Sequence, residues 1–179
     1  TSADSRRTML KGKAGVLRMA KPWFFPRWYH TDQTLIWPNG HVTTLYTADE
    51  PGRLRGPEHA IAWADEVCAW SNPEAWDMLQ MTMRGGRHPR VLVTTTPNSS
   101  RIIRDLIASP ETALSIGSTA ENARNLPPAF LARLLKKYEG TRLGRQELQG
   151  ELVEDADGAL WTRALIEAWR VDAPPSMRR

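Results

Sequence analysis

The sequence contains a single cysteine, Cys68, which excludes an internal disulfide bond and indicates a reducing compartment. It has no apolar run near the roughly 20 residues of a membrane-spanning helix, and no recognisable signal peptide. It also has no internal repeat and no tract of low complexity. We therefore expect a soluble, cytoplasmic protein that makes no contact with a membrane.

A phosphate-binding loop is also missing from the sequence. Lys11–Gly15 is basic and rich in glycine, but the spacing Gly-x-x-x-x-Gly-Lys-Ser/Thr occurs nowhere, so we interpret this segment as a basic turn. The chain begins at Thr1 without a methionine, and residues 173–179 have the composition of a linker. We expect a fragment excised from a longer protein.

The composition is that of a globular protein with a real core. Its 179 residues are 41% hydrophobic and 25% charged, enough for one domain with a small appendage. The net charge of +4 is compatible with a polyanionic partner but is too small to require one. Residues 1–29 are basic and residues 147–157 are acidic. Residues 21–30 mix aromatic and basic side chains, which could stack on single-stranded nucleic acid, but we favour packing against the domain.

The order of the expected elements predicts an α/β fold. Asn39-Gly40 between two β-prone runs predicts a β-hairpin. Strand and helix then alternate, which favours a parallel sheet with crossover helices, and from residue 118 the pattern is purely helical. We expect strands at 60–64, 90–97 and 113–117, and helices at 2–10, 73–83, 99–109, 127–139, 141–152 and 162–170.

An apolar run, Ala60–Ala64, ends in the adjacent acids Asp65 and Glu66. Such a run predicts a strand buried on both faces, with the acids at its carboxyl end, where open α/β sheets bind ligands. In nucleotide-hydrolysing proteins this is the Walker B arrangement, in which the first acid holds Mg²⁺, usually through water, and the second orients the attacking water. Alone, the pattern is weak and more often marks a strand that runs into a solvated turn.

Two further features accompany the acids. An arginine-containing loop with Arg53 and Arg55 precedes them, and the next strand ends in Thr94-Thr95-Thr96. Hydroxyls at that place can sense a γ-phosphate or the attacking water, although a threonine triplet by itself reflects only β-propensity.

Taken together, these features resemble the ATPase domain of phage DNA-packaging terminase large subunits, in particular those of prophages and gene-transfer-agent-like elements. The similarity spans nearly the whole chain, and the ordered set of motifs is far more specific than any one member. The segments that carry it are 37–40, 50–57, 63–66, 93–97, 117–119 with 121–122, 138–147 and 158–161.

The resemblance implies a P-loop NTPase fold of the additional-strand, catalytic-glutamate type: a partial parallel sheet with flanking helices, a β-hairpin and a small helical lid. It assigns residues 1–117 to a partial ATPase core, 118–154 to the lid and 155–179 to a linker toward a nuclease domain. It also implies a role for each matching residue. Asp65 is the Mg²⁺-associated acid, Glu66 the catalytic glutamate, Thr94, Thr95 and Thr96 the coupling motif, and Arg55 (with Arg53 as competitor) an arginine that reaches a neighbouring subunit's ATP.

ATP and Mg²⁺ are the implied cofactors. The implied partners are double-stranded DNA, the portal protein, the terminase small subunit and further copies in a ring on the procapsid. The implied location is the cytoplasm of a bacterial host, transiently at the portal. Because the phosphate-binding loop is missing, we expect the chain alone to be inactive.

Two other functions fit parts of the sequence. A helicase-like translocase ATPase would share the acid-ending strand, but the hairpin, the threonine triplet and the segment 117–119 argue against it. A non-catalytic DNA-binding module would explain the basic residues 1–29, but two acids at a surface facing a polyanion would then be an odd choice.

Overall fold

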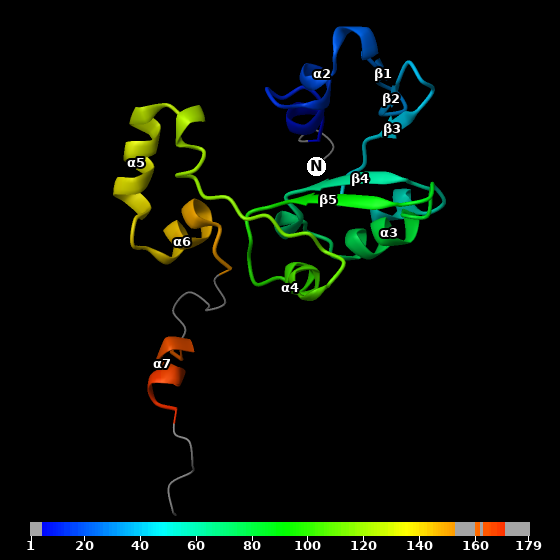
Figure 1. Cartoon of the computed structure of the whole chain (residues 1–179). Helices are drawn as coiled ribbons and strands as arrows, with labels where there is room; N and C mark the ends of the chain where they lie inside the picture. The colour runs from blue at the N-terminus through cyan, green and yellow to red at the C-terminus, as the bar shows by residue number, and fades with distance from the viewer. Residues whose placement is uncertain (1–4, 153–159, 162, 171–179) are drawn as a thin grey trace, which may run out of the picture. The chain divides into compact units, whose positions relative to one another are not determined.

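The computed structural model describes residues 5–152, 160–161 and 163–170. Its contacts divide the chain into two compact units, Thr1–Thr96 and Pro97–Arg179. Figure 1 labels their α-helices and strands, and the described residues also contain short 3-10 or π turns, which are called η below. The domain boundaries predicted at 117/118 and 154/155 stay predictions. No helix of the described residues is long and apolar enough to cross a membrane.

The first unit begins with helical turns, η1 (Ser5–Leu10), α2 (Val16–Met19) and η2 (Pro22–Phe24). The helix predicted at residues 2–10 is present as a π-helical turn, while its predicted caps, Ser2 and Asp4, lie outside the described residues. Lys11–Gly15 forms turns, as predicted.

A three-stranded antiparallel sheet follows, built from β1 (Arg27–Tyr29), β2 (Thr34–Ile36) and β3 (Val42–Thr44). The predicted hairpin is confirmed as β2 and β3, which pair from Thr34↔Thr44 to Ile36↔Val42. Its loop has Gly40 at φ +83°, a conformation that glycine adopts without strain.

The expectation for residues 21–30 was wrong in part. The segment contains η2 and β1, and its rings do not all pack: Trp23 is 80% exposed and Phe25 51% exposed. Pro26 is buried, and Phe24 stacks on Trp37 with ring centroids 5.4 Å apart.

The second sheet of this unit is the parallel pair β4 (Ile61–Asp65) and β5 (Arg90–Thr94), joined through α3 (Glu74–Thr82). This confirms the predicted strand–helix–strand order. A 3-10 turn, η3 (Pro51–Leu54), packs against α3. Gly85 is required where the chain leaves α3, because an added Cβ would stand 2.9 Å from the His59 carbonyl carbon.

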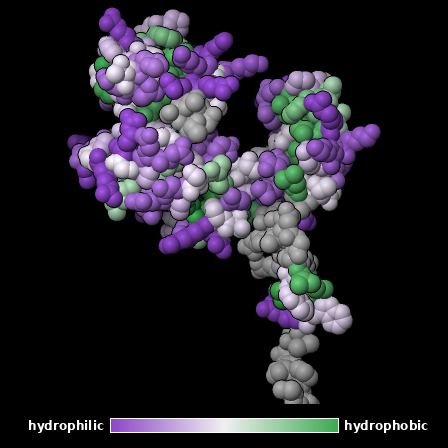
Figure 2. Space-filling model, turned by 180° about the vertical axis from the view of Figure 1, so that it is seen from behind, coloured by the Kyte–Doolittle hydropathy of each residue, from purple (hydrophilic) through white to green (hydrophobic). Residues whose placement is uncertain are grey.

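Burial of this strand pair corrects the prediction of a strand covered on both faces. Ile61 is 78% exposed, Leu92 59% and Trp63 37%, whereas Ala64 is buried. Among the described residues this sheet has only two strands, and a strand is buried on both faces only where other elements pack against each face. Figure 2 accordingly shows hydrophobic side chains at the surface among hydrophilic ones.

The second unit is helical and contains α4 (Arg101–Ala108), η5 (Ala123–Asn125), α5 (Pro128–Tyr138), α6 (Arg142–Gln149) and α7 (Arg163–Ala168). These confirm the predicted helices, except that the cap predicted at Thr162 lies outside the described residues. The side chains of Ser100 and Thr141 cap α4 and α6 by accepting backbone N–H groups. The strand predicted at 113–117 is not formed, because that extended segment pairs with no strand among the described residues.

Candidate functional site

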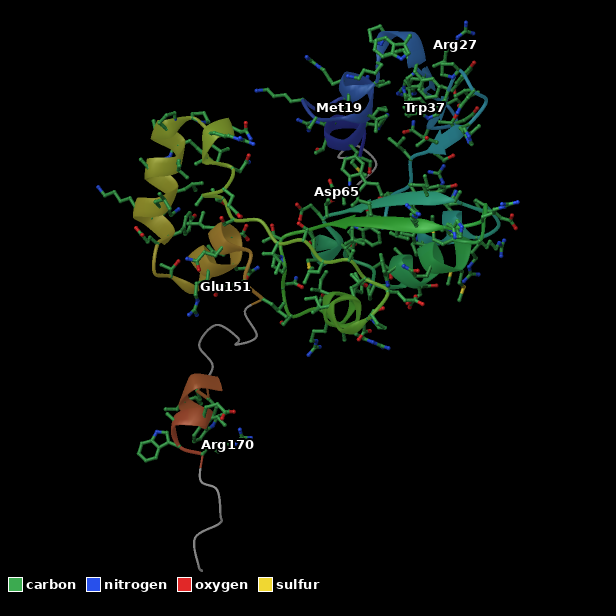
Figure 3. The ribbon with its side chains drawn as sticks, viewed as in Figure 1. Met19, Arg27, Trp37, Asp65, Glu151 and Arg170 are labelled. Atoms are coloured by element: carbon green, nitrogen blue, oxygen red, sulfur yellow. The ribbon has the colours of Figure 1, made fainter. Side chains whose placement is uncertain are left out.

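The acid-ending strand and the threonine-ending strand finish side by side. β4 and β5 run parallel in the register Trp63↔Leu92 to Asp65↔Thr94, so their carboxyl ends meet at one edge of the sheet. Asp65 is half-buried there, and Figure 3 labels it. This edge is where parallel sheets place ligands.

The two predicted groups touch directly. The Thr94 hydroxyl donates a 2.6 Å hydrogen bond to Oδ1 of Asp65. The backbone N–H of Glu66 donates to the Thr94 carbonyl at 2.6 Å, which extends the pairing one residue beyond β4. Asp65 and Thr94 thus form one side-chain unit, which we call the acidic site together with Glu66.

Glu66 itself turns the chain. Its backbone lies in the left-handed region, at φ +51° and ψ 47°, and leads into the 3-10 turn η4 (Val67–Ala69). Non-glycine residues rarely adopt this conformation, and such strain is concentrated at functional sites. The turn leaves the Glu66 side chain exposed beside the half-buried Asp65.

The remaining threonines of the triplet extend this cluster of contacts. The Thr95 hydroxyl oxygen accepts the backbone N–H of Cys68 at 3.1 Å, which connects η4 to the end of β5. The Thr95 hydroxyl donates to the Thr96 carbonyl at 3.2 Å. A displacement of the triplet would therefore change the hydrogen bond to Cys68 and move the turn that follows Glu66.

The arginines are not part of this cluster. Arg55 lies 3.7 Å from Glu74 at the start of α3, and Arg53 lies 3.5 Å from Glu50. An open cavity of about 360 Å³ lies beside Arg55, lined also by Leu54, Pro57, Met78, Met81 and Arg84. Within this chain, neither arginine is brought to the acids.

Two tryptophans that contact the acidic site were not predicted from the sequence. The indole N–H of Trp63 donates to Oγ1 of Thr94 at 2.8 Å, and that of Trp70 donates to the backbone carbonyl of Asp65 at 2.9 Å. The available signal was the spacing of Trp63 and Asp65, since residues two apart on a strand share a face. Only the register with β5 shows that the indole reaches Thr94.

The donor set of the acidic site fits Mg²⁺ held through water. Oδ1 of Asp65 is engaged by Thr94, and no described residue hydrogen-bonds to Oδ2. No three His, Cys, Asp or Glu side chains of the described residues form a group that could hold a metal by themselves. Mg²⁺ keeps several waters and takes one or two carboxylates plus phosphate oxygens, whereas Zn²⁺ requires more protein ligands.

The predicted lid contains a separate, well-defined contact. The carboxylate of Glu121 accepts the backbone N–H and the hydroxyl of Ser118 at 2.6 and 3.1 Å, and these bonds lower its pKa. The N–H of Thr119 donates to the carbonyl of Leu148 at 2.7 Å. The segment 117–119 is thereby connected to the end of α6.

Comparison with known proteins is consistent with these features. No curated protein matches the sequence. Residues 1–168 match the family described as the terminase large subunit, T4likevirus-type, N-terminal. This match covers both sheets, the acidic site and α3 to α6, so the resemblance to terminase large subunits is confirmed. The chain belongs to the N-terminal family of T4-like terminase large subunits.

Proposed function

We propose that this domain supplies the acidic and coupling groups of an ATP-hydrolysing motor that moves double-stranded viral DNA into a procapsid. Membership of the terminase family supports a role in phage DNA packaging. The observation that carries the finer proposal is the 2.6 Å contact between the Thr94 hydroxyl and Asp65 at the shared carboxyl edge of β4 and β5.

Each group has a distinct task in this proposal. Asp65 holds the water shell of Mg²⁺, and the exposed Glu66 carboxylate orients the attacking water and accepts its proton. Bound Mg²⁺ supplies charge neutralisation for the β- and γ-phosphates. The phosphates themselves need backbone N–H groups and a lysine of a phosphate-binding loop, which this sequence does not contain.

In this proposal, Thr94, Thr95 and Thr96 transmit a change at the acidic site to the neighbouring elements of the chain. Thr94 contacts Asp65 directly, while Thr95 contacts the N–H of Cys68. A change at Asp65 thereby reaches both the end of β5 and the turn η4. Arg55 acts in this scheme on the ATP of a neighbouring subunit, where a guanidinium stabilises charge on the transferring phosphoryl group.

The partners follow from the same proposal. They are double-stranded DNA, the portal protein, the terminase small subunit and further copies of the subunit arranged as a ring on the procapsid. The motor works in the host cytoplasm while it is docked at the portal. The basic segment 5–29 adds positive charge suited to a nucleic-acid partner.

The test uses a terminase polypeptide that contains these residues together with a phosphate-binding loop. Glu66→Ala should abolish ATP hydrolysis and leave DNA binding intact, because Glu66 acts on water and not on DNA. Glu58→Ala is the matched control, since Glu58 is an exposed acid paired with Arg84. Equal loss of both activities in Glu66→Ala, or loss of neither, would contradict the proposal and favour a non-catalytic DNA-binding module.

A further inference from the structure

The indole of Trp63 is joined to Asp65 by a chain of two hydrogen bonds. Trp63 Nε1 lies 2.8 Å from Oγ1 of Thr94, which in turn lies 2.6 Å from Oδ1 of Asp65. An indole N–H can only donate, an ionised carboxylate can only accept, and a hydroxyl has one hydrogen. The direction of the chain is therefore fixed: Trp63 donates to Thr94, and Thr94 donates to Asp65.

We propose that Trp63 is a positioning residue for Asp65, acting through the hydroxyl of Thr94. The indole occupies a lone pair of the hydroxyl, so the hydroxyl's hydrogen is directed to the carboxylate and not shared with water. A hydrogen bond to a charged acceptor is stronger than a neutral one, and bonds in a chain polarise each other. The chain of hydrogen bonds does not depend on the proposed function. The inference that a fixed Asp65 helps to hold Mg²⁺ does rest on the proposed function.

Packing alone does not account for the placement of Trp63. Its side chain is 37% exposed, and its strand neighbour in register, Leu92, is 59% exposed. A large ring left this open to solvent gains less from burial than a core residue does. The specific feature of the residue here is its N–H, which finds an acceptor as the polar end of tryptophan usually does.

The rest of Asp65 is held as well, so a small change at Oδ1 is not absorbed by backbone movement. The indole of Trp70 donates to the carbonyl of Asp65 at 2.9 Å. The N–H of Glu66 fixes the following peptide to β5. With the peptide after Asp65 held at both its carbonyl and its N–H, the Thr94 hydroxyl determines how the carboxylate is turned.

The chain also contains a matched control. In the antiparallel sheet, Trp37 Nε1 donates to the hydroxyl of Thr43 at 2.9 Å, which is the same pair of groups at nearly the same distance. Figure 3 labels Trp37, which directly follows β2, and Asp65, the last residue of β4. No carboxylate accepts from Thr43 among the described residues, so this pair reports on the indole–hydroxyl bond alone.

The first experiment is NMR spectroscopy of the 179-residue chain at pH 7, following the indole N–H signals and the side-chain carboxyl carbon of Asp65. Trp63→Phe should shift the Asp65 carboxyl signal in the direction produced by Thr94→Val, whereas Trp37→Phe should not. Reciprocally, Thr94→Val should move the Trp63 indole signal upfield, and Thr94→Ser should restore it. Thr43→Val should affect only Trp37. The reciprocal arm leaves Trp63 in place, so it can overturn the proposal even if Trp63→Phe fails to fold.

The proposal is overturned if Thr94→Val shifts the Asp65 carboxyl signal while a folded Trp63→Phe does not. It is also overturned if Thr94→Val leaves the Trp63 indole N–H signal unchanged. A second readout uses the ATPase-competent polypeptide. Trp63→Phe should raise the Mg²⁺ concentration for half-maximal hydrolysis by about five-fold, the typical effect of one hydrogen bond, with the maximal rate little changed. An unchanged Mg²⁺ requirement would also overturn it. Failure of the proposed function would appear separately, as hydrolysis that survives Glu66→Ala.

Discussion

Nη2 of Arg55 lies 3.7 Å from Oε1 of Glu74, which joins the loop after η3 to the first turn of α3. Both side chains are largely exposed, at 70% and 53%. An exposed ion pair of this kind contributes about 0–1 kcal/mol. Arg55 can therefore exchange Glu74 for a more highly charged anion, such as a phosphate group presented by another subunit, at little cost to folding.

If Arg55 acts on the ATP of a neighbouring subunit as proposed, Arg55→Ala should lower ATP hydrolysis by the assembled motor by about 10³-fold or more, the effect typical of an arginine finger. The stability of the subunit should change by less than about 1 kcal/mol. The measurement is the ATPase rate of the assembly against that of the isolated subunit, together with thermal unfolding. Arg53→Ala is the matched control, because Arg53 has a comparable exposed partner in Glu50. If Arg53→Ala lost activity and Arg55→Ala kept it, the role would belong to Arg53.

The left-handed backbone of Glu66 allows its proposed chemical role to be tested separately from its backbone strain. Glu66→Ala and Glu66→Gly should both abolish hydrolysis, since each removes the carboxylate. The glycine variant should be more stable than the alanine variant by about 1 kcal/mol, because only glycine adopts φ +51° without strain. Denaturant unfolding measures the difference.

Gln33, at φ +55°, provides the control for that prediction. Gln33→Gly should relieve the same kind of strain and leave hydrolysis unchanged, because Gln33 belongs to the antiparallel sheet region. An alanine variant of Glu66 as stable as the glycine variant would show that this backbone conformation costs nothing.

The elements that the sequence predicted correctly are those with strong local signals. Asn39-Gly40 specifies the hairpin loop, and Ser100 and Thr141 cap the helices that begin after them. Parallel pairing of β4 with β5 followed from the alternation of strands and helices. Each of these signals acts within a few residues or within one strand–helix–strand unit.

The errors concern features that depend on distant partners. Residues 113–117 are β-prone, but a strand forms only where a neighbour completes its hydrogen bonds. Exposure of Ile61 depends on which elements pack against the face of β4, which the run Ala60–Ala64 does not encode. The contact of Trp63 with Thr94 depends on the register of two strands 31 residues apart in sequence. The acids and threonines were predicted to lie together because they stand at the ends of two strands, and the structure pairs those strands.

His59 should make the stability of the first unit depend on pH. Burial lowers the pKa of His59, and its Nε2 is buried without a hydrogen-bond partner among the described residues. The unfolded chain takes up a proton near pH 6.5, whereas the folded chain resists it, so stability is full above that pH and falls as the pH drops. His59→Phe should flatten this slope between about pH 5 and 7.

The measurement is urea unfolding at several pH values in this range. Phenylalanine retains an aromatic ring next to Tyr46, whose ring centroid lies 5.5 Å from that of His59. His88→Phe is the control, because His88 is exposed and its loss should leave the slope unchanged. A slope that persists in His59→Phe would assign the pH dependence to other groups.

The junction between α5 and α6 should not tolerate a side chain at Gly144. Its N–H donates to the hydroxyl of Thr141 at 2.9 Å, and an added Cβ would clash with the carbonyl oxygen of Tyr138. That oxygen also accepts the Thr141 hydroxyl at 2.6 Å, so it cannot move away without loss of the α6 cap. Alanine gains about 1 kcal/mol in helix propensity, but overpacking costs about 1–3 kcal/mol and loss of the cap about 1 kcal/mol more.

We therefore expect Gly144→Ala to destabilise the α5–α6 pair, seen as faster hydrogen exchange of the α6 amides. Gly52→Ala is the control, because an added Cβ there meets no atom within 4 Å and the backbone φ is not positive. That variant should be neutral or slightly stabilising. If residues 118–154 are the lid that transmits the nucleotide state, Gly144→Ala should also reduce the DNA packaged per ATP hydrolysed more than it reduces hydrolysis itself. Exchange as slow as in the wild type would mean that the junction accommodates the methyl group and that the cap on α6 is not tightly held.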